Sequence, residues 1–184
     1  PLRFTINSNK EPGVRPFAHG RADGRHRLQQ SIGDPKAGIQ ELYAALARDE
    51  ARNALILNDV IRALEDGRSP ILLTERTDHL DYFARRLDRV ARNLVVLRGG
   101  KGARADRAVR AQLAAIPVHE ERMLLATGRY IGEGFDDARL DTLFLTLPVS
   151  WKGTLVQYTG RLHRLHPGKR DVQIFDYVDR EVPM

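Results

Sequence analysis

The sequence predicts a three-layer α/β domain built on a mainly parallel sheet of five or six strands. Short apolar runs alternate with segments of helical period along most of the chain. The runs are apolar throughout, which is typical of strands covered on both faces. Because crossovers between parallel strands are right-handed, this alternation predicts a doubly wound sheet with helices on both sides.

Five apolar runs are the predicted strands. They are residues 71–73, 94–97, 123–126, 143–145 and 172–175.

Helical patterns fill the segments between and before these strands. The first helical region carries two separate apolar stripes, made of Leu42, Ala45 and Leu46 and then of Ala54, Leu57, Ile61 and Leu64. Asp66 and Gly67 form a stop signal for the second stripe. Further helices are predicted over residues 80–91, over residues 103–115 and before the last strand.

Residues 1–36 differ from the rest of the chain. They are rich in Gly, Pro, Asn and Arg, and they show no sustained period. We therefore predict a flexible linker or arm over residues 1–36 and a folded domain over residues 37–184.

Composition excludes several classes of site and favours an anionic partner. The 184 residues carry a net charge of +6 and include no cysteine, which excludes disulfides, thiolate metal sites and cysteine nucleophiles. A basic surplus favours nucleic acid, because phosphate contacts release condensed counterions. No signal-peptide pattern opens the chain and no apolar run could span a bilayer, so we expect a cytoplasmic protein without membrane contacts.

The carboxyl ends of the predicted strands indicate where a ligand binds. The residues that follow them are 74–76, 98–100, 127–129 and 148–150, all polar, basic or glycine-rich. In doubly wound sheets, ligands bind outside the carboxyl ends of the strands. One edge of the sheet is therefore the predicted working edge.

Two further segments carry candidate chemistry. Residues 127–137 follow the third strand and contain three closely spaced glycines, which expose backbone N–H groups to an anion. On a helix over 155–164, Leu155, Tyr158, Thr159 and Leu162 form an apolar face. Gln157, Arg161 and Arg164 lie on the opposite face, where arginine forks match phosphate oxygens.

These two segments resemble motifs V and VI of the superfamily 2 helicases and translocases. The residues that carry the first likeness are Thr127, Gly132, Glu133, Gly134 and Asp136, and those that carry the second are Gln157, Gly160, Arg161 and Arg164. Residues 69–74 are similar to motif IV of the same group, and Leu97 to Gly100 fit the glycine turn after the next strand. The resemblance covers roughly residues 50–178 and implies a second, C-terminal RecA-like domain.

The resemblance also implies roles for individual residues. Arg164 and Arg161 would be arginine fingers for a Mg–ATP held mainly by a preceding N-terminal RecA-like domain. Gln157, Gly134 and Asp136 would contact or couple to that nucleotide. Thr74, Gly99, Thr127 and Gly128 would contact the nucleic-acid backbone.

Departures from the family pattern narrow the comparison. His163 stands where Gly is common, and residues 69–74 lack a frequent Phe. These differences favour repair- or restriction-type members over DEAD-box RNA helicases, and DNA over RNA. No G-x4-G-K-[ST] P-loop or acidic Walker B partner occurs, so the chain alone is expected not to hydrolyse ATP although its parent protein would.

Two alternatives stay open at this point. The chain could be a non-catalytic nucleic-acid-binding or regulatory module that keeps the helicase fold, or part of a restriction-type motor subunit whose endonuclease domain lies elsewhere in a longer chain. His163 and His166 are spaced like a ligand pair, but no third ligand accompanies them, so no metal site is predicted.

Overall fold

The computed structural model describes residues 3–7, 35–99, 102–128, 130, 137–148, 159–160 and 162–177. Its helices are α2 (Pro35–Arg48), α3 (Glu50–Glu65), α4 (Thr77–Leu87) and α5 (Gly102–Ala115). Its strands are β1 (Arg3–Asn7), β2 (Pro70–Thr74), β3 (Leu94–Leu97), β4 (Met123–Thr127), β5 (Thr142–Leu145) and β6 (Asp171–Asp176). All five predicted strands are confirmed, within one or two residues at their ends.

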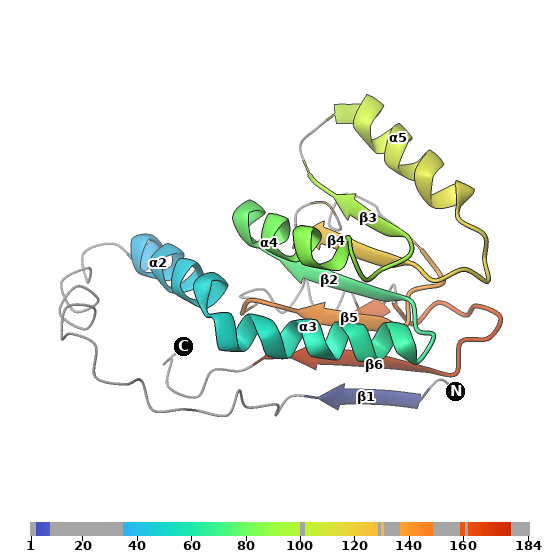
Figure 1. Cartoon of the computed structure of the whole chain (residues 1–184), viewed down its shortest axis with the longest axis horizontal. Coiled ribbons are helices and arrows are strands. Elements are labelled where there is room, and N and C mark those ends of the chain that lie inside the picture. The colour runs from blue at the N-terminus through green and yellow to red at the C-terminus, as the bar shows by residue number, and fades with distance from the viewer. Residues whose placement is uncertain are drawn as a thin grey trace.

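The six strands form one sheet in the order β1-β6-β5-β2-β4-β3, and every neighbouring pair is parallel. All carboxyl ends therefore lie along one edge, toward which the arrowheads point in Figure 1. The predicted parallel α/β fold is confirmed.

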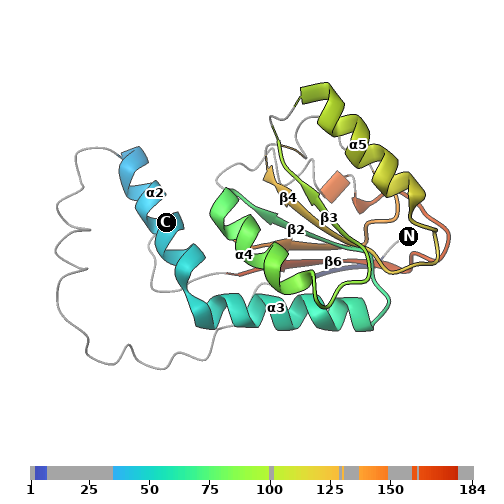
Figure 2. The ribbon, with the colours of Figure 1, turned by 45° about the horizontal axis from the view of Figure 1, so that its top comes forward.

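Helices cover both faces of the sheet, and the strand residues alternate between them. Along β2, Leu72 packs with α3 and α4, in a cluster that includes Ile56 and Phe83. Its neighbours Ile71 and Leu73 belong to the opposite cluster, against which Val109 and Leu113 of α5 pack. Figure 2 shows α3 and α5 on either side of the strands. The domain therefore has three layers, as predicted.

The expectation of an irregular arm over residues 1–36 is wrong at its beginning. Arg3–Asn7 forms β1, which pairs with β6 in parallel register from Arg3 opposite Asp171 to Asn7 opposite Phe175. A five-residue edge strand is too short to produce a sustained period, so its sequence did not separate it from the Gly- and Pro-rich residues that follow.

The predicted apolar stripe of α3 is only partly correct, since Leu64 is buried in the core but the other three residues are not fully buried. Ala54 is exposed, and Leu57 and Ile61 are only half-buried. The buried face is instead Arg52, Asn53, Ile56, Asp59, Val60, Ala63 and Leu64. Three polar residues on this face explain the error, since an apolar pattern assigns polar residues to solvent.

Arg52 is the largest of these buried polar side chains and is 1 % exposed. Its guanidinium donates to the carbonyl of Thr146, directly after β5, and to the carbonyl of Tyr177, directly after β6, at 3.1 Å. The Tyr177 hydroxyl donates in turn to the carboxylate of Asp59, at 3.1 Å. Asp59 lies further along the same buried face of α3. One helix thus binds the carboxyl ends of two neighbouring strands.

Arg68 plays the same part at the amino ends of the strands that Arg52 plays at their carboxyl ends. It lies just before β2 and donates to the Thr142 hydroxyl at 2.5 Å and to the Asp171 carboxylate at 2.9 Å. Thr142 begins β5 and Asp171 begins β6. The amino ends of these three strands are therefore held by a single guanidinium.

Replacing Arg52 by alanine is expected to lower the free energy of unfolding by about 3 kcal/mol or more, because buried acceptors lose their donor. Arg62→Ala, at an exposed position on the same helix, is the matched control and should change it by less than about 0.5 kcal/mol. Urea unfolding followed by circular dichroism measures both, and equal losses in the two variants would contradict the role given to Arg52.

Candidate nucleic-acid interface

The predicted contact residues Thr74, Gly99, Thr127 and Gly128 gather at the carboxyl edge of the sheet. Thr74 ends β2 and Thr127 ends β4, and the two residues are direct partners in the parallel ladder. The Gly99 amide, which follows β3, donates to the Thr127 hydroxyl across 3.4 Å. We call these four residues the rim. Three separate strands bring them together, as the sequence predicted.

Thr74 is part of the core as well as of the rim. Its side chain is buried and its hydroxyl lies 3.1 Å from Nδ1 of His79. The other ring nitrogen of His79 lies 2.8 Å from Oδ1 of Asn53, whose amide nitrogen donates to the Ala47 carbonyl. A chain of hydrogen bonds therefore runs from the rim, through α4, to α3 and the end of α2.

This chain fixes the protonation state of His79. Because the Asn53 amide nitrogen is used by Ala47, Oδ1 faces the imidazole and Nε2 must carry the proton. Nδ1 is then an acceptor for the Thr74 hydroxyl, and all groups are satisfied with a neutral ring. Burial, with the positive charge of Arg52, lowers the pKa of His79 to about 4.

The arginines next to the rim are held by neighbouring carboxylates. Arg76 donates to Asp78 through two nitrogens, at 2.9 and 2.7 Å. Arg98, after β3, forms an ion pair with Asp81 of α4. Both of these positive charges therefore have partners within the domain.

Glu75 adds a negative charge that the sequence-based assignment of roles omitted. It follows Thr74, and its carboxylate lies against the backbone of Gly128. Its presence at the end of a strand was visible in the sequence, but only the parallel register of β2 and β4 brings it to the glycine.

Arg164 lies away from the rim. Its carbonyl accepts a hydrogen bond from Nζ of Lys169 at 3.0 Å, and the same ammonium donates to the Ala138 carbonyl at 3.1 Å. Lys169 comes two residues before β6 and Ala138 four residues before β5, which places this turn at the amino edge of the sheet. The strands separate the two edges by about 13–20 Å.

The helical segment before Arg164 is described only in part. Leu162 is buried in the core, as predicted for the apolar face, but the helix ends at residue 162 and Arg164 lies in a bend after it, so the prediction of a helix as far as residue 164 is wrong at its end. The candidate residues Gln157, Arg161, Gly134 and Asp136 lie outside the described residues, so their roles stay predictions.

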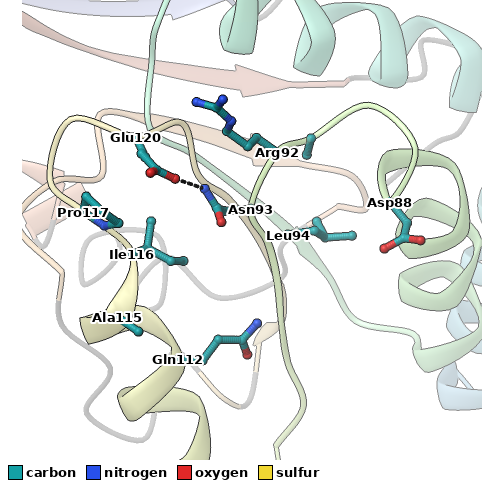
Figure 3. Close-up of a pocket in the computed structure, with 10 residues that line it drawn as sticks. Asp88, Arg92, Asn93, Leu94, Gln112, Ala115, Ile116, Pro117 and Glu120 are labelled. Atoms are coloured by element: carbon teal, nitrogen blue, oxygen red, sulfur yellow. Dashed lines mark hydrogen bonds between the residues drawn. The ribbon is translucent and has the colours of Figure 1, made fainter.

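A pocket of about 580 Å³ lies elsewhere, between the loop that follows α4 and the end of α5 with the residues after it (Figure 3). Asp88, Arg92, Gln112 and Glu120 are among its lining residues, and Asn93 donates to Glu120 at 3.0 Å. None of the rim residues or Arg164 lines it. We therefore place the candidate site at the rim, where three strand ends converge, and not in this pocket.

In the part of the chain that the structure describes, no group of three or more His, Asp or Glu side chains is arranged to hold a metal ion. Likewise, none of the described helices combines the length and apolar character that a bilayer crossing requires.

Comparison with known proteins supports the fold. No family model and no curated protein matches the sequence. Among solved structures, the C-terminal part of the Fun30 ATPase domain is similar with a TM-score of 0.60 and 11% identity, over 73% of this chain and 43% of that one. UvsW of T4 is similar with a TM-score of 0.58 and 13% identity, over 97% of this chain and 31% of that one.

The comparisons confirm the predicted RecA-like α/β fold, of the kind found in helicase domains. At these identities the likeness extends to the fold alone. The chain spans less than half the length of either structure.

Lowering the pH is expected to destabilise the domain through His79. The folded-state pKa near 4 lies below the ordinary 6.5, so the unfolded chain binds the extra proton. The contribution of the neutral His79 to the free energy of unfolding is fully present above about pH 6.5. It is lost as the pH falls toward 4 and below, by about 3 kcal/mol in total.

Comparison with His79→Gln isolates this contribution from those of other acidic groups. The variant should lose less unfolding free energy than the wild type between pH 7 and about pH 4, measured by urea unfolding at each pH. His119→Gln, at an exposed position, is the matched control. Identical pH dependence in the wild type and His79→Gln would refute the neutral buried imidazole.

Proposed function

We propose that this chain is the C-terminal RecA-like domain of an ATP-dependent superfamily 2 helicase or translocase. The observation that carries the proposal is the rim, where Thr74, Gly99, Thr127 and Gly128 meet at the carboxyl edge of a RecA-like sheet. These residues match, position by position, the segments for which the sequence implies contacts to a nucleic-acid backbone.

The rim is suited to a backbone and not to base recognition. Gly99 and Gly128 present main chain without side-chain bulk, whereas the Thr74 and Thr127 hydroxyls are buried and form hydrogen bonds within the domain. Backbone groups contact phosphates without reading sequence. The net charge of +6 adds a general attraction for polyanions. The differences from the helicase motifs at His163 and in residues 69–74 favour DNA over RNA as the bound nucleic acid, and we place the enzyme in the cytoplasm.

The nucleotide would be handled from a separate place. Arg164 and Arg161 would reach the γ-phosphate of a Mg–ATP bound by an N-terminal RecA-like domain of the same polypeptide, with Gln157, Gly134 and Asp136 at the same seam. Two binding surfaces at different edges of one domain agree with two different ligands. Hydrolysis would then require closure of the two domains, which links ATP turnover to movement along a strand.

Arg164→Ala is expected to reduce ATP turnover by about 10³–10⁵-fold in a polypeptide that joins this chain to its P-loop domain, because an arginine finger stabilises charge on the transferred phosphoryl group. ATP binding should change little. DNA-stimulated phosphate release and nucleotide titration measure the two quantities. The variant keeps the backbone carbonyl that Lys169 binds, so the turn is expected to stay folded.

Arg170→Ala is the matched control, because Arg170 is exposed and belongs to the same turn before β6. Unchanged turnover in Arg164→Ala would remove the finger assignment. Absence of turnover in the wild-type polypeptide would favour the alternative, a nucleic-acid-binding or regulatory module with a helicase fold.

A further inference from the structure

Glu75 places an anionic group inside the rim. A Cβ atom added to Gly128 would lie 2.2 Å from Oε1 of Glu75 and 3.0 Å from its Cδ. The carboxylate is therefore in direct contact with the Gly128 backbone, and any residue with a side chain at position 128 would displace it.

The carboxylate is partly withdrawn from water at this position. Glu75 as a whole residue is exposed, yet burial of its acidic end raises the pKa above the ordinary value. Its neighbour Arg76 is engaged by Asp78, and Arg98 of the next rim segment by Asp81. Both of these arginines thus already have a carboxylate partner.

We propose that Glu75 is a competing anion, whose carboxylate occupies the place that a nucleic-acid phosphate takes on the Gly128 backbone. The inference rests on the proposed function, since it concerns the same rim. Carboxylate and phosphate groups are both anionic and repel each other, so a phosphate that reaches Gly128 is opposed until the Glu75 side chain moves aside. Exposure and a flexible stem allow this displacement without movement of β2.

The consequence is that the rim binds a nucleic-acid phosphate only weakly, because Glu75 competes with it. A carboxylate that returns to Gly128 when a phosphate leaves keeps the occupied and empty states close in free energy. Weak, reversible contact is what stepping along a strand requires, because a tight phosphate site would hold the domain in place.

Glu75→Gln tests the inference, because it removes the charge and keeps the size and one acceptor oxygen. Glu65→Gln removes the same charge from an exposed position at the end of α3. Binding of the 184-residue chain to a fluorescein-labelled single-stranded oligodeoxythymidylate is measured by anisotropy at fixed low salt. Glu75→Gln should bind about fivefold more tightly than the wild type, the effect of one like-charge contact in water, and Glu65→Gln should match the wild type.

Amide resonances of Gly128 and Gly99, followed during the same titration, locate the contact. Shifts at both glycines that saturate at lower oligonucleotide concentration in Glu75→Gln support the inference. Equal gains in the two variants, unchanged affinity of Glu75→Gln, or binding that leaves the Gly128 resonance unmoved would overturn it and leave the proposed function intact. Absence of binding by the wild type and both variants would overturn the proposed contact of the rim with nucleic acid, and this inference with it.

Discussion

The buried guanidinium of Arg52 is the constraint on which the carboxyl edge of the sheet depends. It joins the carbonyls after β5 and β6 to α3, and the next residue, Asn53, joins the same helix to His79 and so to Thr74 at the end of β2. Two adjacent residues of one helix therefore fix three of the strand ends. A charge inside a protein is stabilising only while its partners stay in place, so this arrangement ties the geometry of the edge to the integrity of the core.

The rim inherits its shape from that internal network. Thr74 is held by its hydrogen bond to the buried His79, and Thr127 is aligned with Thr74 through the parallel ladder of β2 and β4. What the rim presents outward is mainly glycine backbone, with one carboxylate lying over it. The domain thus separates the groups that set position, which are buried and paired, from the groups that a ligand can reach.

Sequence patterns predicted the sheet well because its strands are continuous apolar runs, and they predicted the rim because parallel strands share one carboxyl edge. They failed where polar residues are buried. Arg52 and Asn53 occupy the core face of α3, and only their distant partners make this possible. The contact between Glu75 and Gly128 was beyond prediction for a related reason, since it depends on the relative register of two strands more than 45 residues apart.

The pairing of β1 with β6 bears on how this domain can be handled in isolation. The strand from the beginning of the chain covers one side of the strand nearest its end. A fragment that starts at α2 would leave the outer amide and carbonyl groups of β6 uncovered, and an open parallel edge of this kind can pair with another molecule. Self-association of such a shortened fragment would then be a property of its boundary and would say nothing about the assembly of the protein.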